Sequence, residues 1–360
     1  MAKRTIIPFG PQHPVLPEPI HLDLVLEDEK VVEAIPQIGY IHHGLEKLTE
    51  KIEWPEMVYI IERVCGICSF GHGWGYCKSI EGNFGLDVPP RAEYLRTIWH
   101  ELSRIHSHLL WLGLLADSFG FESLFMHSWR LRETILDIFE ETTGGRVIFS
   151  VCKVGGVRKD VDNEKLTDIV KTLKGMEKEL FELTDVFMED VSVKSRLVGV
   201  GTLTKEEAFG LGAVGPVARG SGVNNDVRLD GHGVYGELDF EPCLEETGDS
   251  YARCKVRARE LFQSIALIEK AVSMIPDGDI AVEIKGKHPA GEFVGRLEQP
   301  RGEAIYYSKG QGQKLLDRLR VRTPTNANVP ALVKMLQGCE LADVPVLVLT
   351  VDPCISCTER

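Results

Sequence analysis

Two Cys-x-x-Cys pairs constrain this 360-residue chain more than any other feature of its sequence. The first pair is Cys65 and Cys68, and the second is Cys354 and Cys357, close to the C-terminus. Chain ends usually fray unless something ties them down, and a dithiol on a frayed end would be open to oxidation. A shared site would account for both pairs, because four thiolates can hold zinc, an iron–sulfur cluster or another soft metal.

The separation of the pairs bears on which kind of metal they would hold. Zinc ribbons place their two pairs about 15–20 residues apart within one small module. Here almost the whole chain lies between the pairs, so a shared site would join both ends of the chain at the centre of the fold. This spacing favours a functional metal over a structural zinc ion, but it does not exclude zinc.

Composition limits the other classes of function. The chain has 41 Lys and Arg against 54 Asp and Glu, a net charge of −13, which argues against nucleic acid as a partner and gives no support for direct docking on anionic lipid. No window approaches the roughly 18 apolar residues that cross a bilayer. The N-terminus has no apolar signal core, and nine cysteines, an odd number, argue against a disulfide framework. We therefore expect a cytoplasmic protein without a transmembrane segment of its own.

Hydrophobic periodicity predicts a predominantly helical α+β fold, in which a core of long helices carries small β layers from the N-terminal and C-terminal segments. Residues 20–35 alternate around a charged turn and predict a β-hairpin. The long helices are expected at about 89–118, 121–141, 163–188 and 251–275. The pattern predicts one domain, with a β-rich N-terminal part (1–50), a helical core (51–275) and a β-containing C-terminal part (276–360).

Shorter elements follow from local signals. A helix is expected from Pro55 toward Cys65, and Asn163 is a plausible helix cap. The sequence "TKEE" at 204–207 is typical of a capping box. The glycine-rich segment 210–222 predicts a loop whose backbone approaches another segment closely. After Pro276 the sequence predicts strands at "DIAVEIKG", "EAIYYSKG" and "RLRVRTP", a helix at about 329–338, and a buried strand "PVLVLTV" that leads into "DPCISC".

The residues around the cysteines carry a resemblance to a known family. "RVCGICSFGH" (63–72) and "DPCISC" (352–357) resemble the two cysteine motifs of the nickel–iron hydrogenase large subunit. The rest of the chain resembles the energy-converting, membrane-bound branch of that family and its relative, the quinone-site subunit of respiratory complex I. The supporting segments span the chain: "GPQHP" (10–14), "HHGLEKL" (42–48), "GVGTL" (199–203), "GPVARGSG" (215–222) and "QPRGEAIYY" (299–307).

The resemblance implies a ligand set and a reaction. In the family, four thiolates bind nickel, and two of them bridge to an iron that carries carbon monoxide and cyanide. Cys65 and Cys354 would be the terminal nickel ligands, and Cys68 and Cys357 would bridge nickel and iron. The implied activity is the reversible reaction H2 = 2 H+ + 2 e−, and soft thiolate ligands suit it.

The resemblance also implies a proton route. The family uses a terminal cysteine sulfur as base, here Cys354, and then a glutamate near the N-terminus, for which Glu18 is the candidate. The alternative for Glu18 is a solvated turn glutamate. The rate of proton reduction in Glu18→Gln distinguishes the two.

Other residues around the metal are implied in the same way. Arg301, which follows Pro300, matches the arginine over the open metal position, and its guanidinium is a fixed, charged donor. Asp352 would accept hydrogen bonds from that arginine. His72 would donate a hydrogen bond to a bridging sulfur.

The sequence departs from the uptake enzymes of the family at several places. The spacing from Glu18 to His21 is one residue longer than in those enzymes. On the helix that reads "HSH", Ser107 replaces an aspartate, so the partners of the arginine must differ. Glu46 matches a glutamate that binds magnesium together with a C-terminal histidine, but Arg360 stands at the position of that histidine. Magnesium at Glu46 and a Glu46–Arg360 ion pair are therefore competing expectations.

The implied assembly is a complex. Isolated cysteines leave no set for an iron–sulfur relay, so the resemblance implies a small subunit with a [4Fe-4S] cluster, ferredoxin as redox partner, and integral-membrane subunits that translocate ions. The chain would be peripheral, on the cytoplasmic side of the membrane. Arg360 stands at the position where a protease ends family precursors after nickel insertion, so a processed form and a gene that ends at this residue are competing expectations. Two other functions stay open: a complex I-like quinone-site subunit without nickel, and a protein with a structural four-cysteine zinc site.

Overall fold

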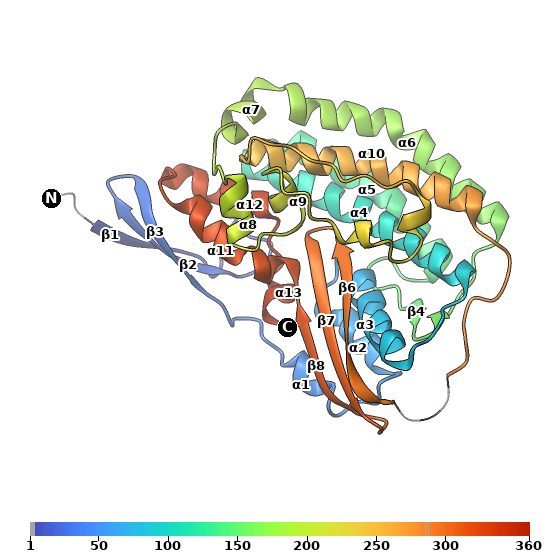
Figure 1. Ribbon diagram of the computed structural model, residues 1–360. Coiled ribbons are helices and arrows are strands. Elements are labelled where there is room, and N and C mark those ends of the chain that lie inside the picture. The colour runs from blue at the N-terminus through green and yellow to red at the C-terminus, as the bar shows by residue number, and fades with distance from the viewer. Residues whose placement is uncertain (1–3, 285, 287) are drawn as a thin grey trace.

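Four long helices form the core of the computed structural model, which describes residues 4–284, 286 and 288–360 (Figure 1). They are α4 (Pro90–Ser118), α5 (Glu122–Thr143), α6 (Asn163–Glu189) and α10 (Ser250–Met274). α4 packs against α5 and α10, and α6 packs against α5 and α10 from outside. Because it is surrounded, α4 buries polar residues as well as apolar ones along most of its length.

Two three-stranded antiparallel sheets extend from this core. The N-terminal sheet contains β1 (Arg4–Phe9), β2 (His21–Glu27) and β3 (Lys30–Gln37), and the C-terminal sheet contains β6 (Ala290–Gln299), β7 (Gly302–Gln311) and β8 (Leu316–Arg322). β4 (Cys152–Lys153) and β5 (Gly156–Val157) form a small ribbon. The prediction of a predominantly helical α+β fold with small β layers is therefore confirmed.

Short helices connect these parts. Near the first cysteine pair lie α1 (Leu45–Leu48), α2 (Met57–Ile61), the 3-10 turn η1 (Glu62–Val64) and α3 (Ser69–Phe84). The middle of the chain has α7 (Val191–Leu197), α8 (Lys205–Gly210), α9 (Gly215–Arg219), η2 (Val227–Asp230) and η3 (Tyr235–Glu237). The C-terminal part has α11 (Pro324–Leu336), η4 (Leu341–Asp343), α12 (Val344–Val351) and α13 (Ile355–Glu359).

Many of the predicted elements are present with small shifts of their ends. The hairpin in 20–35 is β2–β3, the four long helices lie where expected, and the capping box at Thr204 and Glu207 is formed. The helix expected from Pro55 begins at Met57. The predicted cap Asn163 was wrong by one residue, because the Asp162 carboxylate accepts the Lys165 N–H at 2.7 Å and makes Asp162 the cap.

The buried strand expected at "PVLVLTV" was wrong, because this segment is helix α12. Pro345 lies in the first turn, where a proline is tolerated in a helix. The apolar run is buried on every side against α4, α10 and α11, and an apolar run of this length fits a buried helix as well as a buried strand. The Trp111 indole N–H donates to the Leu349 carbonyl oxygen at 2.6 Å, which fixes α12 on α4.

Three further predictions need correction. The helix expected at 329–338 begins at Pro324. The Asn-rich segment joins this helix because the Asn328 side chain accepts from the Val214 N–H and donates to the Val214 carbonyl oxygen, instead of favouring a local turn. The glycine-rich loop 210–222 contains the short helix α9. "DIAVEIKG" makes only an isolated bridge at Ala281 among its described residues, with Lys285 outside them, whereas the long strand β6 was not expected.

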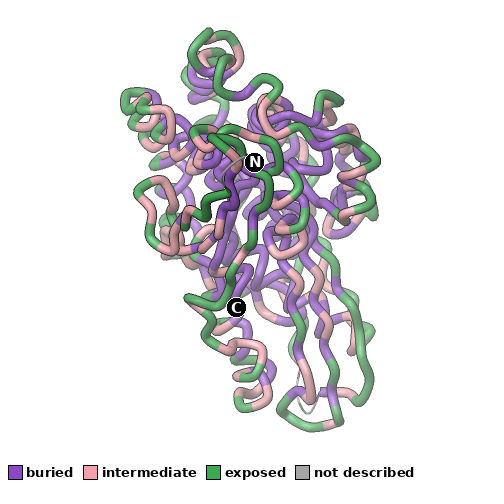
Figure 2. The backbone as a smooth tube through the Cα atoms, turned by 90° about the vertical axis from the view of Figure 1, so that its left-hand side faces the viewer, coloured by how far each residue is buried: buried purple, intermediate pink, exposed green. Residues whose placement is uncertain are grey.

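The C-terminal segment is buried and bonded to distant parts of the chain. The Glu359 carboxylate accepts the backbone N–H groups of Gly39 (2.7 Å) and Ile41. The Thr323 hydroxyl donates to the Cys357 carbonyl oxygen, and the Cys354 N–H donates to the Thr325 hydroxyl. Figure 2 shows that buried residues run through the interior, whereas exposed ones lie on outer loops and at the tip of the C-terminal sheet. The chain end is thus tied down, as the dithiol requires.

Replacement of Glu359 tests this attachment. In Glu359→Ala two backbone N–H groups lose a charged acceptor, and such a hydrogen bond contributes about 1.5–3 kcal/mol. We expect amide exchange at Gly39 and Ile41 to become roughly ten- to a hundredfold faster, measured by hydrogen exchange. Glu340→Ala, at an exposed position, is the control and leaves these amides unchanged. Equal exchange in both variants would contradict the attachment.

Candidate metal centre

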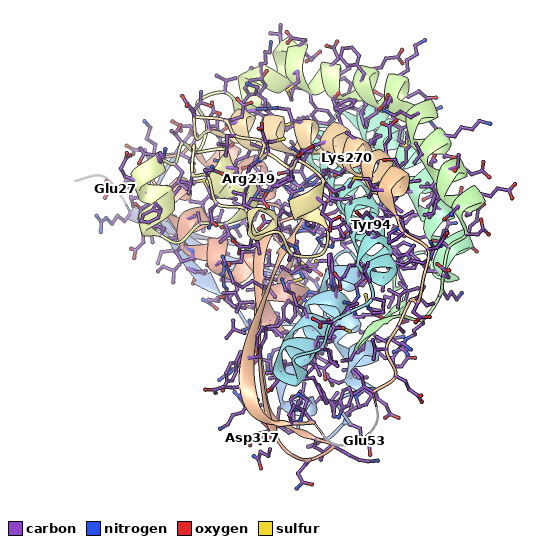
Figure 3. The ribbon with its side chains drawn as sticks, turned by 45° about the vertical axis from the view of Figure 1, so that its right-hand side comes forward. Glu27, Glu53, Tyr94, Arg219, Lys270 and Asp317 are labelled. Atoms are coloured by element: carbon purple, nitrogen blue, oxygen red, sulfur yellow. The ribbon has the colours of Figure 1, made fainter. Side chains whose placement is uncertain are left out.

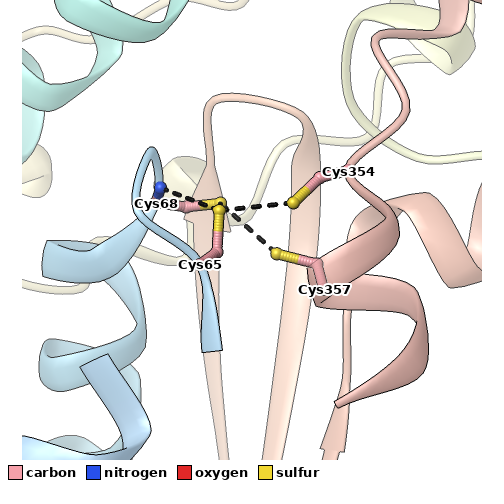
Figure 4. A group of neighbouring side chains, drawn as sticks. All are labelled: Cys65, Cys68, Cys354 and Cys357. Atoms are coloured by element: carbon pink, nitrogen blue, oxygen red, sulfur yellow. Dashed lines mark hydrogen bonds between the residues drawn. The ribbon is translucent and has the colours of Figure 1, made fainter. Parts of the chain in front are cut away.

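The four predicted cysteines come together in the structure (Figure 4). Their sulfur atoms all lie within 4.8 Å of one another. The Cys65 sulfur is 3.2 Å from those of Cys68 and Cys354, and the Cys68 sulfur is 3.5 Å from that of Cys357. All four side chains are buried as free thiols. Within residues 4–284, 286 and 288–360, this is the one group of three or more potential ligands found close enough to hold a metal ion.

Two chain reversals place these sulfurs. Cys65 follows the 3-10 turn η1 in an extended conformation, and Cys68 immediately precedes α3. Cys354 immediately precedes α13, and Cys357 lies in the first turn of that helix. Asp352 ends α12 with φ of 60°, a left-handed conformation that aspartate tolerates better than most residues. This reversal turns the chain from α12 into α13 and directs the second pair at the first.

The donor set fits a soft transition metal. It consists of sulfur alone, without carboxylate or imidazole, and thiolates select metals such as nickel, iron and zinc. The N–H groups of Ile67 and Cys68 point at the Cys65 sulfur at 3.3 and 3.4 Å. Hydrogen bonding with Cys354, Cys357 and Cys65 lowers the pKa of Cys68 well below its usual value. Against the effect of Cys357, hydrogen bonding with Cys65 and Cys68 raises the pKa of Cys354, and burial raises the pKa of Cys357. Cys68 is therefore the member of these three that carries negative charge most readily.

Arg301 lies at the tip of a two-residue hairpin loop beside the sulfurs. Gln299 of β6 pairs with Gly302 of β7, so Pro300 and Arg301 form the turn. An added Cβ at Gly215 would lie 2.2 Å from the Arg301 carbonyl oxygen, and one at Gly302 would lie 2.7 Å from the Gly215 nitrogen. The predicted close approach of the glycine-rich segment is thus to the Arg301 turn, and both positions have positive φ.

The Arg301 guanidinium is held by three partners. It donates to the Asp352 side chain at 2.7 Å, to the Asp352 carbonyl oxygen at 2.9 Å and to the Ser107 hydroxyl at 3.2 Å. One nitrogen lies 3.9 Å from the Cys68 sulfur. Burial opposes the charge on Arg301, but Asp352 and Cys68 outweigh burial and hold its pKa well above its usual value. Arg301 is therefore a fixed positive charge at the edge of the sulfur cluster.

His72 contacts the second cysteine pair through one ring nitrogen. Its Nε2 lies 3.3 Å from the Cys357 sulfur, and its Nδ1 lies 2.9 Å from the Tyr306 hydroxyl. The Tyr306 oxygen also receives the Gln299 amide at 3.0 Å. If the Tyr306 hydroxyl donates to Nδ1, the His72 proton lies on Nε2 and points at sulfur. Tyr306 and Gln299 were missed in the sequence, although β7 alternation places Tyr306 on the buried face.

Glu18 lies next to the second cysteine pair but forms its contacts with backbone groups. Its carboxylate accepts the N–H groups of Ile355 and Ser356, the latter at 3.0 Å, and the Ser356 hydroxyl. These are the residues directly after Cys354. Glu18 is therefore fixed on the segment that carries two of the four sulfurs, as a solvated turn glutamate would not be.

A pocket of about 320 Å3 lies beside the cluster. Glu18, Arg301, Asp352 and Cys354 are its polar members, and the rest of its wall is mainly apolar. Ile67 and Trp129 in that wall are partly exposed, so the pocket opens toward the surface. One oxygen of Asp352, Oδ2, is buried without a hydrogen-bond partner among the described residues. The sulfur cluster thus has a side from which a small molecule can approach it.

Glu46 lies apart from this pocket and is surrounded by cations. Its carboxylate accepts from Arg320 at 2.7 Å, from Arg360 at 3.3 Å and from the Val321 N–H at 2.9 Å. These are the contacts of the ion-pair alternative. Two guanidinium groups on one carboxylate oppose the binding of a further cation there.

Comparison with known proteins identifies the family. A model described as nickel-dependent hydrogenase matches residues 43–116, and one described as the 49-kDa subunit of respiratory-chain NADH dehydrogenase matches residues 118–286 and 282–360. The membrane-bound hydrogenase subunit alpha of Pyrococcus furiosus is 38% identical over 98% of this chain and 87% of its own length. The chain belongs to the nickel–iron hydrogenase large-subunit family, in the branch related to complex I.

Two further relatives describe the breadth of this family. The carbon monoxide-induced hydrogenase of Rhodospirillum rubrum is 40% identical over 98% of this chain and 99% of its own length. A chain in the structure of the membrane-bound sulfane sulfur reductase, an archaeal respiratory membrane complex, superimposes with a TM-score of 0.94 at 31% identity, over 99% of this chain and 98% of that chain. The hydrogenase large-subunit fold is thus shared by oxidoreductase subunits with different named activities.

A cysteine substitution tests the centre. Cys68→Ser removes one of four thiolates, so we expect the purified protein to lose at least about tenfold in bound transition metal, measured by elemental analysis. Cys254→Ser, a buried cysteine of α10 outside the cluster, is the matched control and retains metal. Equal metal content in the two variants would show that Cys68 is not a ligand.

Proposed function

We propose that this chain is the catalytic subunit of a hydrogenase complex that interconverts hydrogen with protons and electrons at a nickel–iron centre. The family membership and the two hydrogenase relatives support the reaction class. The cluster of four buried sulfurs supports the metal. Cys65 and Cys354 would hold nickel as terminal ligands, and Cys68 and Cys357 would bridge nickel and an iron with carbon monoxide and cyanide ligands. When bound, this group would supply the redox chemistry of the hydrogen–hydrogen bond.

The observation that carries the proposal is the pocket beside Cys354. A structural zinc site is closed by its four ligands, whereas a reactive centre keeps an open position. Here an apolar pocket with three ionisable side chains lies against one sulfur of the set. An apolar wall suits a small apolar substrate, and the ionisable groups suit a reaction that moves protons.

The chain's own residues would position charge and move the proton. The Arg301 guanidinium, held by Asp352 and Ser107, would maintain a fixed positive charge at the open side. The Cys354 sulfur would act as the base, and Glu18 would pass the proton onward, since it is anchored on the two residues that follow Cys354. His72 would donate to Cys357 and keep that sulfur in place. General acid–base residues typically contribute about 10²–10⁴-fold in rate.

The proposed assembly is membrane-bound. None of the described helices is long and apolar enough to cross a membrane, yet a hydrogenase relative is named as membrane-bound and the structural neighbour belongs to a respiratory membrane complex. We place the chain as a peripheral subunit on the cytoplasmic side. A small subunit with a [4Fe-4S] cluster would exchange electrons with ferredoxin, and integral-membrane subunits would translocate ions.

The second candidate is a complex I-like quinone-site subunit, which the match to the 49-kDa subunit favours. Such a subunit has no need of four metal-binding thiols, and this chain retains all four. The third is a structural zinc site. The pocket beside Cys354 is the observation against it.

Metal analysis of the anaerobically purified complex distinguishes the three candidates. We expect nickel, together with iron in excess of nickel because the [4Fe-4S] cluster of the small subunit adds its iron to that of the centre, and infrared bands of iron-bound cyanide and carbon monoxide. Zinc in place of nickel would support the structural site, and a cluster without metal would support the quinone-site subunit. An active complex without nickel would refute the proposal.

Glu18→Gln tests the proton route. The amide keeps the size of the side chain but cannot carry a carboxyl proton, so we expect proton reduction with an artificial electron donor to fall by about 100-fold or more. The metal content and cyanide bands should not change, which separates a proton defect from a damaged centre. Glu53→Gln, on the surface, is the control. Proton reduction near the wild-type rate would remove Glu18 from the route.

A further inference from the structure

A network of buried ionic side chains lies inside the core, between α4, α9, α10, η2 and β6. Figure 3 labels one member, Arg219, within the body of the molecule. Every member is at most 3% exposed. The members are Glu101, Arg104, Arg219, Asp226, Arg228, Glu260 and Glu298. Burial of this many charges is costly unless they balance.

Arg219 is the centre of this network. One of its terminal nitrogens lies 2.7 Å from the Glu298 carboxyl and 2.9 Å from that of Asp226. The other lies 2.8 Å from Glu260. The network continues through Arg228, which contacts Asp226 at 2.8 Å and Glu101 at 3.5 Å.

The charges of the network do not balance. Four carboxyl groups face three guanidinium groups, so full ionisation would leave one negative charge in excess. Two histidines touch the network, and burial lowers the pKa of His100 and of His108 to about 4, so both are neutral at physiological pH. The next cation, Arg257, forms no ion pair within 4 Å with any of the four carboxyl groups among the described residues. It donates to the Arg253 and Val351 carbonyl oxygens and stacks on Trp111, and it acts on Asp352 and Glu260 only at longer range.

Geometry identifies the carboxyl that differs from the others. Glu101, Asp226 and Glu260 each lie within 4 Å of at least two guanidinium groups. Glu298 has one such partner, Arg219, and its second oxygen accepts only the Val227 N–H at 3.2 Å. Its neighbour across Arg219 is a second acid, Asp226. Glu298 is thus the least stabilised of the four as an anion.

We propose that Glu298 is a proton-binding site, whose carboxyl holds the one exchangeable proton that makes the buried network electrically neutral. In agreement with the geometry, burial and the charge of Asp226 raise the pKa of Glu298 to about 7. The two arginines near Glu101 lower the pKa of that acid to about 2 against the effect of burial. Because the Glu298 proton is lost as the pH rises through about 7, the network gains its uncompensated charge on the alkaline side.

Titratable and charged groups lie around Glu298 on every neighbouring element. From α4 these are His100, Glu101, Arg104 and His108; from α9, Arg219; from the η2 region, Asp226 and Arg228; from α10, Glu260; from β6, Arg296; and from β7, Glu303, the cross-strand partner of Glu298. Arg296 is directed outward, with its ion pairs to Asp230 and Glu303. None of them touches the sulfur cluster through a contact found in the described chain.

A surface cleft lies close to this site. It has a volume of about 420 Å3, and its walls include Trp74, Lys78 and His232. The His232 Nδ1 lies 3.1 Å from the Val227 carbonyl oxygen. The backbone N–H of Val227 donates to the Glu298 carboxyl. Val227 therefore links His232, in the wall of the cleft, to the carboxyl that would hold the proton. His232 Nε2 has no hydrogen-bond partner among the described residues.

The carboxyl that would hold the proton also belongs to β6, the strand that leads into the turn of Arg301. The Glu298 carbonyl oxygen accepts from His100 at 2.8 Å and from Arg104 at 2.9 Å, so the network fixes the strand three residues before Arg301. The backbone of β6 therefore links the protonation site to the Arg301 turn. The inference does not require that the sulfur cluster hold nickel, so it stands or falls separately from the proposed function.

Infrared spectroscopy of the purified complex tests the inference. We expect a protonated-carboxyl C=O band that disappears with a midpoint near 7 between about pH 5 and about pH 9, and that shifts in D2O. The Glu298 band should be missing in Glu298→Gln, whereas a second band should remain from Glu62, a buried acid whose pKa burial also raises to about 7. The Glu298 band should persist in Glu292→Gln, which changes an exposed glutamate of the same strand.

A second variant keeps the test decisive if Glu298→Gln does not assemble. Asp226→Asn removes the excess negative charge and leaves three carboxyl groups against three guanidinium groups. We expect the midpoint of the Glu298 band to fall by at least about one pH unit. An unchanged midpoint in Asp226→Asn, or a band with a midpoint near 7 that survives when Glu62→Gln and Glu298→Gln are combined, would overturn the assignment, whatever metal the complex contains.

Discussion

The contact between the turn at Cys65–Cys68 and the segment at Cys354–Cys357 is the constraint on which the rest of this structure depends. It joins residues 289 positions apart. Such a contact has a large entropic cost of loop closure. Several hydrogen bonds offset this cost. Glu359 accepts from the chain after β3, and Thr323 and Thr325 form hydrogen bonds with the cysteine segment. The centre is therefore assembled by the complete fold and not by either motif alone.

Around that contact, the fold brings charge to the sulfurs on rigid supports. Arg301 is at the tip of a tight hairpin that two glycines allow to pack against α9, and Ser107 is a fully buried residue of α4. These supports leave little freedom for the guanidinium, which is what a fixed electrostatic role requires. The ion network behind the hairpin extends the same principle inward. Arg104 of that network holds the strand before Arg301 because it donates to the Glu298 carbonyl oxygen.

The sequence predicted a large part of the fold because long amphipathic helices are determined locally. Helices α4, α5, α6 and α10 each have an apolar face with a 3.6-residue period and a clear beginning. The failures lie where tertiary contacts decide. The run at 344–351 is almost entirely apolar, so it has no hydrophobic periodicity that would distinguish a helix from a strand. Its burial among three helices decides that it forms α12. Asn328 is inside a helix because its side chain bonds Val214.

By itself, the sequence determined the chemistry of the centre. The two cysteine pairs and their flanking residues indicate four soft ligands, an arginine and its carboxylate partner. This prediction was possible because all of these residues lie in short, recognisable sequence motifs. Only the tertiary structure decided which groups meet. Tyr306 and Gln299 behind His72, the two arginines on Glu46, and the unequal numbers of acids and arginines around Glu298 all depend on segments that converge from distant parts of the chain. Local pattern contains no information on such contacts, because electrostatic balance is a property of neighbours in space.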